Sequence, residues 1–535
     1  MNRFRPGPLL LTALAALGAA LGLGAAPQVR AQASHDPNAA DLPIASSPAT
    51  ATRPADPAAL PAPRRFVSHH SIRVGGKPLA YTAIAGETYL HNDAGEATGS
   101  IFSFSYIKDG PLQTRRPVMF VFNGGPGSSS IWLHMGIVGP RRVVLDRDVN
   151  PSNVPPFGLA DNPDTLLDVA DLVFIDPVGT GWSRAIGVGH AADFWGVNED
   201  ADAVSQFIEQ WLSDHNRWNS PKYVMGESYG STRAALLPRA LMGGPTYVGV
   251  MRGITLNGVI LLGTTLEARE ASGAPHLEMK DALELPAIAD TAWYYRKVDR
   301  KGLDLEAFHA AAYDFALGDY ARALAQEKAG TLPPQQRQAI IARLTAWTGL
   351  PASSFEKSLT LSATHYAAGL LSDKGEDVGL YDSRYTLPVK NSGNDPVSDD
   401  PAMGQYVPGF VAAFHQMLSS DLGVKMDRPY GAIVWRDLLP KWNWKRTPLP
   451  QDQSFATDLA VAMRRNARLQ VLVASGYYDL VTSAAAAQYT VQRADLPADR
   501  VTIKRYASGH MLYLGDTAAS FASDIRRLIQ NTAQK

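Results

Sequence analysis

Tyr223-Val-Met-Gly-Glu-Ser-Tyr-Gly230 is the most informative stretch of this 535-residue sequence, because a short apolar run leads directly into a Gly-x-Ser-x-Gly turn. A helical run, Thr232–Leu237, follows the turn. A strand, a tight turn with serine at its apex and a helix are together typical of a nucleophile elbow, which presents the serine hydroxyl at the carboxyl edge of a sheet. Glycines flank the serine because neighbouring backbone comes very close at such a turn. The stretch therefore predicts a nucleophile at Ser228.

Short apolar runs that end in glycine-rich turns recur on both sides of this stretch, and we expect them to form further strands. They are Val118–Phe122, Leu172–Ile175, Gly253–Leu256 and Val471–Ala474. Uninterrupted apolar runs suit strands that are covered on both faces, as in a parallel sheet. Apolar residues at positions 204, 207, 208, 211 and 212 predict an amphipathic helix between two of these strands. The alternation predicts an α/β fold, with a mostly parallel central sheet flanked by helices.

The domain organisation follows from where these patterns stop. Strand signals fade between residues 271 and 427, where helical patterns dominate, so we expect a helical cap inserted into the sheet domain. The sheet domain then consists of residues 66–270 and 428–535. Residues 34–65 are rich in Ala, Pro and Asp without apolar periodicity, which predicts a disordered linker or propeptide.

The first 33 residues have the pattern of a secretory signal peptide. Arg3 and Arg5 precede an apolar run from Leu9 to Leu23, and Ala31-Gln-Ala33 is a small-x-small cleavage signal. The run is shorter than the roughly 20 residues that span a bilayer. We therefore expect a secreted or periplasmic protein that has no membrane anchor once the signal is removed.

Composition narrows the possible functions. The chain has 45% apolar and 19% charged residues and a formal net charge of −1, as expected for a large globular protein with no nucleic-acid partner. It contains no Cys, which excludes disulfides, a thiolate nucleophile and Cys-ligated metals. His-Glu-x-x-His and phosphate-binding glycine motifs are also absent, so we expect neither a metal nor an organic cofactor. The sequence leaves the oligomeric state open.

A serine nucleophile needs a base and a carboxylate that orients it. His510 follows the alternating, strand-like run Val501–Arg505 and is the only His after residue 415. Asp479 ends an apolar run between the Ser and the His, which makes it the favoured third member. Its rivals, in more polar stretches, are Asp495, Asp499 and Asp516.

Acyl chemistry also needs two backbone N–H donors for the oxyanion, one after the nucleophile and one from a loop after an earlier strand. Tyr229 follows the nucleophile and supplies the first donor. Gly125, in the loop Asn123-Gly-Gly-Pro-Gly127 after an apolar run, is the best candidate for the second.

Four segments together resemble the signatures of the serine carboxypeptidases, in order and in rough spacing. They are Asn123-Gly-Gly-Pro-Gly-Ser-Ser129, Asp176-Pro-Val-Gly-Thr-Gly-Trp-Ser183, Gly226-Glu-Ser-Tyr-Gly230 and Gly509-His-Met511. The resemblance extends over about residue 65 to the C-terminus and implies an α/β-hydrolase fold with a helical cap. It also implies an enzyme that removes C-terminal residues from peptides.

The resemblance assigns roles to individual residues. It implies the triad Ser228, Asp479 and His510, with Gly125 and Tyr229 as the oxyanion hole. It further implies that the substrate's C-terminal carboxylate is bound by Asn123, Gly124 and Glu227, and that Met511 lines the pocket of the leaving residue. A protonated Glu227 could donate a hydrogen bond to that carboxylate, whereas an ionised one would repel it. We therefore expect activity on peptides to be favoured by acid pH.

The chain departs from the family pattern at three positions. The family usually has a second Glu two residues before a Gly-Pro, which shares a proton with the Glu beside Ser, but Ile137 occupies that position here. Val121 replaces the usual Trp two residues before the Asn, and Ser128 replaces a Cys. These departures indicate a divergent branch of bacterial type.

The sequence therefore predicts a secreted serine-type carboxypeptidase that acts on peptides with a free C-terminus through an acyl-enzyme. One alternative is an esterase or acyltransferase with the same Ser-His-Asp residues, because the second Glu is missing. A more remote alternative is a non-catalytic binding protein on a hydrolase scaffold.

Overall fold

The computed structural model describes residues 60–111, 114–145, 149, 153–244, 248–266, 279–389, 395–446 and 454–533. The predicted signal peptide, most of the predicted linker and the first residues of the predicted cap lie outside these ranges. Within the described ranges, no helix has both the length and the apolar character needed to cross a membrane.

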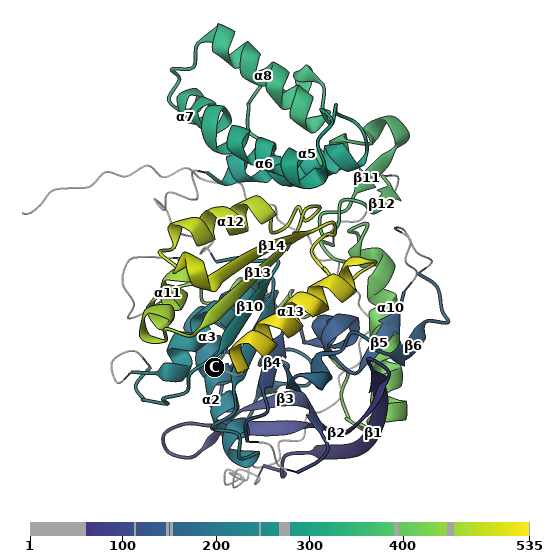
Figure 1. Cartoon of the computed structure of the whole chain (residues 1–535), viewed down its shortest axis with the longest axis vertical. Helices are drawn as coiled ribbons and strands as arrows, with labels where there is room; N and C mark the ends of the chain where they lie inside the picture. The colour runs from purple at the N-terminus through teal and green to yellow at the C-terminus, as the bar shows by residue number, and fades with distance from the viewer. Residues whose placement is uncertain are drawn as a thin grey trace, which may run out of the picture. The chain divides into compact units, whose positions relative to one another are not determined.

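A sheet of ten strands organises the described part of the chain (Figure 1). Its order is β1-β2-β3-β7-β4-β9-β10-β13-β14, with β8 paired to β3. The strands are β1 (Arg65–Val74), β2 (Lys77–His91), β3 (Ala97–Lys108), β4 (Val118–Phe122), β7 (Asp171–Ile175), β8 (Arg184–Ala185), β9 (Lys222–Glu227), β10 (Gly258–Leu262), β13 (Gln470–Gly476) and β14 (Val501–Tyr506). From β7 to β14 all neighbours are parallel, whereas β1, β2, β3 and β8 pair antiparallel. The predicted mostly parallel sheet is confirmed.

The predicted strand at Gly253–Leu256 is wrong, because β10 begins only at Gly258. Ile254 and Leu256 are buried, as their apolar character requires, but they lie in the connection that leads into the strand. There the N–H of Ile254 donates to the carbonyl of Leu241, at the end of the preceding helix, instead of to a neighbouring strand. Burial alone therefore produced the strand-like pattern.

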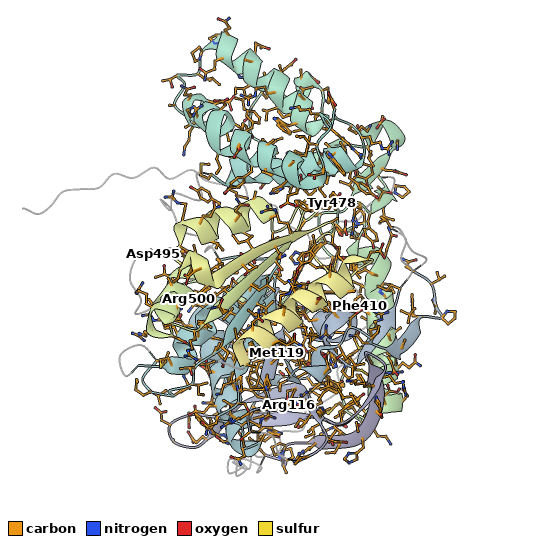
Figure 2. The ribbon with its side chains drawn as sticks, viewed as in Figure 1. Arg116, Met119, Phe410, Tyr478, Asp495 and Arg500 are labelled. Atoms are coloured by element: carbon orange, nitrogen blue, oxygen red, sulfur yellow. The ribbon has the colours of Figure 1, made fainter. Side chains whose placement is uncertain are left out.

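Helices cover both faces of the sheet. On one face lie α10 (Met403–Gln416) and α13 (Thr517–Ala533), in the same apolar cluster as Met119 and Phe410, which Figure 2 labels. On the other face lie α2 (Val197–Asp214), α3 (Tyr229–Met242), α11 (Ala456–Arg465) and α12 (Ala484–Arg493). Alternate residues of β4 enter the two clusters, because successive side chains of a strand point to opposite faces.

A separate helical cap has its own apolar core. It contains α5 (Lys280–Tyr294), α6 (Leu305–Phe315), α7 (Ala321–Lys328), α8 (Pro334–Thr348) and α9 (Ala363–Gly369). The cap meets the sheet domain at α12, where the Ser483 hydroxyl donates to the Leu283 carbonyl over 2.9 Å. Tyr478, labelled in Figure 2, packs edge-on against Tyr294 of α5, with ring centroids 5.3 Å apart.

Residues 271–427, expected as one cap, divide into two kinds of structure. The described residues from α5 to α9 pack with each other, whereas α10 packs against the sheet through Phe410 and Phe414. Helices of both kinds bury apolar residues, so the apolar pattern alone does not distinguish a cap helix from one on the sheet. Among the described residues, the other α-helix is the short α1 (Ile131–Leu133).

The other strands form two pairs, β5 (Arg141–Val144) with β6 (Gly158–Asp161) and β11 (Glu376–Val378) with β12 (Thr386–Pro388).

A buried ion pair joins α2, α3 and the loop after β4. Arg233 of α3 donates from Nε to Asp200 Oδ2 of α2 over 2.7 Å, and from Nη1 to the carbonyl of Asn123 over 2.8 Å. Both side chains of the pair are buried. Loss of one charge would leave the other unpaired in a medium of low dielectric constant.

We expect Asp200→Asn to lower the free energy of unfolding by about 3–5 kcal/mol, because it leaves Arg233 buried without its counter-ion. Asp202→Asn, two residues along the same helix, is the matched control. Asp202 is half exposed, and its partner Arg252 keeps a second partner in Glu209. Urea unfolding followed by circular dichroism measures both variants, and equal losses would contradict the role assigned to the buried pair.

Candidate active site

Ser228 lies at a strained turn between β9 and α3. Its φ of 59° and ψ of −129° are unusual for a residue with a side chain, and its N–H donates to the Leu262 carbonyl over 2.9 Å. A Cβ atom on Gly226 would lie 1.9 Å from the Gly230 carbonyl oxygen, so only glycine fits there. This is the geometry of a nucleophile elbow, at the position where the sequence predicted one.

The structure brings His510 and Asp479 together after β14 and β13. Asp479 Oδ2 lies 2.8 Å from His510 Nδ1, and both side chains are buried. Asp479 Oδ1 accepts the N–H groups of Val481 and Thr482, over 2.8 and 2.9 Å. A carboxylate at Nδ1 holds the neutral imidazole in the tautomer that leaves Nε2 free to accept a proton. The rival carboxyl groups Asp495, Asp499 and Asp516 are exposed.

The hydroxyl of Thr482 contacts both Asp479 and His510, and sequence reasoning missed this residue. Its hydroxyl donates to Asp479 Oδ2 over 2.6 Å and lies 3.1 Å from His510 Nδ1. It follows Asp479 by three residues in the turn that leads to α12, and no motif marks it. Its effect is to fix the carboxylate against the imidazole.

The electrostatics of the pair favour a positive imidazole. Burial disfavours the charged form of His510, but the charge of Asp479 and its hydrogen bond outweigh burial and raise the pKa of His510 above its usual value. A base that must hold a proton during a reaction benefits from this stabilisation.

The imidazole lies against the strand that neighbours the elbow. A Cβ atom on Gly263, directly after β10, would lie 2.8 Å from His510 Cε1. Leu262, the residue before it, accepts the N–H of Ser228. The elbow and the imidazole are thus both placed by the carboxyl end of β10, as expected for a site at the carboxyl edge of a parallel sheet.

The glycine-rich loop after β4 packs against the start of α3. A Cβ atom on Gly124 would lie 2.4 Å from the Tyr229 nitrogen, and Gly125 has a φ of +108°. Gly125, Ser228 and Tyr229 line one cavity of about 550 Å³. The rest of its wall mixes apolar, hydroxyl-bearing and charged side chains, which include Thr232, Thr264, Thr265, Leu266, Lys280, Leu283, Glu284, Trp444, Phe455, Leu480, Thr482 and Ser483. The predicted oxyanion residues therefore face a space that can hold an acyl group.

Glu227, beside the nucleophile, is a buried carboxyl group with two neutral donors. Asn123 Nδ2 donates to its Oε2 over 2.8 Å, and the Tyr513 hydroxyl donates to the same oxygen over 2.9 Å. Burial raises the pKa of Glu227 to about 7, although the positive charge of His510 and the two hydrogen bonds act in the opposite direction. The carboxyl group can therefore be neutral in mildly acidic solution.

Met511, predicted in the leaving-residue pocket, lies in the apolar cluster of α10 and α13 and is buried. Tyr513, two residues later, is the residue of this loop that reaches Glu227, and sequence reasoning missed it. Within the described ranges, no group of three or more His, Asp or Glu side chains has a metal-binding arrangement.

Comparisons with known proteins agree with these motifs over part of the chain. The serine carboxypeptidase family profile matches residues 87–269. A pheromone-processing carboxypeptidase of Metarhizium robertsii is 30% identical over 149 residues, which cover 28% of this chain and 22% of that protein. Serine carboxypeptidase-like 9 of Arabidopsis thaliana is 26% identical over 208 residues, 37% of this chain and 45% of that protein. The chain spans less than half the length of these curated relatives.

Solved structures of other hydrolases align over most of the chain, but loosely. A carboxyl esterase from Bacillus coagulans aligns with 84% of this chain and 98% of its own, at 12% identity and a TM-score of 0.31. A haloalkane dehalogenase variant from Bradyrhizobium elkanii aligns with 88% and 98%, at 13% identity and a TM-score of 0.30. Residues 87–269 of the chain match the serine carboxypeptidase family, and they belong to a domain with a mostly parallel sheet and a serine at the turn between β9 and α3.

Proposed function

We propose that this serine hydrolase releases the C-terminal residue of peptides through an acyl-enzyme. The observation that carries the proposal is Glu227, a buried carboxyl group directly before the elbow serine, whose pKa burial raises to about 7. Its protonated form can donate a hydrogen bond to the free carboxylate of a peptide C-terminus. An ester or amide at that end offers no such partner. Export directed by residues 1–33 stays a prediction from the sequence.

In the proposed reaction Ser228 attacks the carbonyl carbon of the last peptide bond. His510 Nε2 takes the hydroxyl proton and then delivers it to the leaving amine, and Asp479 stabilises the imidazolium between these steps. The N–H groups of Gly125 and Tyr229 bind the oxyanion. Water, activated by the same imidazole, then hydrolyses the acyl-enzyme and regenerates Ser228.

Substrate recognition in this proposal divides between two places. Asn123, Gly124 and Glu227 bind the C-terminal carboxylate on the leaving side. The cavity of about 550 Å³ receives the acyl side, and its lining combines apolar side chains with hydroxyl groups and the charged Lys280 and Glu284.

The pH dependence follows from two coupled groups. The active form has His510 neutral and Glu227 protonated. Activity on free-acid peptides should fall as the pH rises through about 7, because Glu227 then loses its proton. It should also fall at acid pH, where His510 is protonated. The pH of highest activity on free-acid peptides is therefore expected closer to neutral than the sequence analysis predicted.

We expect Glu227→Gln to widen the pH range of free-acid peptide hydrolysis on its alkaline side. An amide stays neutral, so the alkaline limb near pH 7 is lost. Below about pH 7 Glu227 of the unmodified protein is already neutral, so the acid limb, which His510 sets, should keep its position. The measurement is kcat/KM from pH 4 to 9 with a blocked dipeptide, its C-terminal amide and its ester. If the unmodified protein hydrolyses the free acid and the amide at equal rates, the proposed release of C-terminal residues is contradicted. A general esterase or amidase activity would then be the better assignment.

Ser228→Ala should lower kcat by at least about 10⁴-fold, because the covalent route is lost. It should also abolish labelling by an organophosphorus serine probe. Ser213→Ala, an exposed serine of α2, is the control and should behave like the unmodified protein. Labelling that survives in Ser228→Ala would show that another residue is the nucleophile.

A further inference from the structure

We propose that Tyr513 is the positioning residue of Glu227, in place of the second Glu that the serine carboxypeptidase pattern has at the position of Ile137. This inference rests on the proposed function, in which Glu227 binds the C-terminal carboxylate of the substrate. The Tyr513 hydroxyl would donate a hydrogen bond to one carboxyl oxygen of Glu227. The other carboxyl oxygen would then carry the proton that is donated to the substrate.

The contact is direct and buried. The Tyr513 hydroxyl donates to Glu227 Oε2 over 2.9 Å, and both side chains are at least 95% buried. Tyr513 follows His510 by three residues in the connection between β14 and α13. The connection between β14 and α13 therefore supplies both the imidazole of His510 and the hydroxyl that orients Glu227. The position of one is coupled to the position of the other.

The segment that lacks the second Glu makes room for the tyrosine. A Cβ atom on Gly136 would lie 2.3 Å from Cδ2 and 2.5 Å from Cε2 of the Tyr513 ring. Any side chain at position 136 would displace the ring. Ile137, the next residue, is buried in the same apolar cluster as Tyr513 and offers no polar group. Gly136, Ile137 and Tyr513 thus form one arrangement that replaces a carboxyl group with a phenol.

The hydrogen-bond pattern decides where a proton on Glu227 can reside. Both donors, Asn123 Nδ2 and the Tyr513 hydroxyl, are bonded to Oε2. An oxygen that accepts two hydrogen bonds is the poorer position for a third hydrogen, so the proton of the neutral acid belongs on Oε1. Oε1 is then the atom that donates to a substrate carboxylate.

A phenol differs from a second carboxyl group in its titration. Burial raises the pKa of Tyr513 well above its usual value, so the hydroxyl stays a donor over the whole working range. The titratable groups that act on Glu227 and Tyr513 are His510 and Asp479 from the loops after β14 and β13, and Tyr406 of α10. Recognition of the carboxylate therefore depends on one carboxyl proton, not on a proton shared by two acids.

The test compares Tyr513→Phe with Tyr406→Phe. Tyr406 belongs to the same aromatic cluster, and among the residues that the structure describes its buried hydroxyl has no partner. Tyr513→Phe removes a bond that favours ionised Glu227, so the alkaline limb of kcat/KM for a free-acid peptide should move up by about one pH unit. Below that limb its KM should rise about tenfold, because Glu227 is no longer held. Activity on an ester without a free carboxylate should be unchanged, and Tyr406→Phe should resemble the unmodified protein.

A second variant and a second readout guard against misfolding. Gly136→Ala should displace the Tyr513 ring and shift the limb in the same direction. The infrared band of the protonated Glu227 carboxyl, assigned by its loss in Glu227→Gln, should titrate at higher pH in Tyr513→Phe. Unchanged profiles and an unchanged band in Tyr513→Phe would overturn the positioning role. Failure of the unmodified protein to release any C-terminal residue would instead overturn the proposed function, and the infrared titration would still test the contact.

Discussion

Backbone packs directly against backbone where the loop after β4 meets the elbow, and the site depends on this contact. Cβ atoms on Gly124 and Gly226 would lie 2.4 and 1.9 Å from backbone atoms of Tyr229 and Gly230. Side chains cannot enter such contacts, so the elbow serine keeps its strained conformation and the loop stays beside it. The buried Arg233 also holds the loop in place, because its guanidinium donates a hydrogen bond to the Asn123 carbonyl.

Two carboxyl groups serve this site in different surroundings. Asp479 accepts hydrogen bonds on both oxygens, from two backbone N–H groups, Thr482 and His510, and such an arrangement stabilises a negative charge beside the imidazole. Glu227 accepts on one oxygen only, from two neutral side chains. Burial then favours its neutral form. Two acids in one site can in this way take opposite roles, one as a fixed charge and one as a proton donor.

Helix α5 and the turn after β13 contribute to the same cavity and share apolar clusters, since Leu480 packs with the helices α5 to α9 and Leu283 packs with Ala485. Leu283 of α5 faces Leu480 and Thr482, which belong to the turn after β13. Because this turn also contains Asp479, one short segment contributes both to the wall of the cavity beside Ser228 and to the orientation of the imidazole.

Local sequence was sufficient for the parallel strands β4, β7, β9, β13 and β14, for the elbow, and for the positions of Asp479 and His510 after their strands, but it did not predict the antiparallel strands β1, β2, β3 and β8. Each predicted feature leaves a local signal: an apolar run, a glycine that cannot be replaced, or a carboxyl group at the end of a strand. The strand expected at Gly253–Leu256 and the single cap expected over residues 271–427 were harder to predict, since burial gives the same apolar pattern whatever the residues pack against. The roles of Thr482 and Tyr513 could not be predicted from the sequence, for a different reason. A hydroxyl acts through the oxygen it touches, and only the folded chain brings Tyr513, across 286 residues, to Glu227 in the space that Gly136 leaves open.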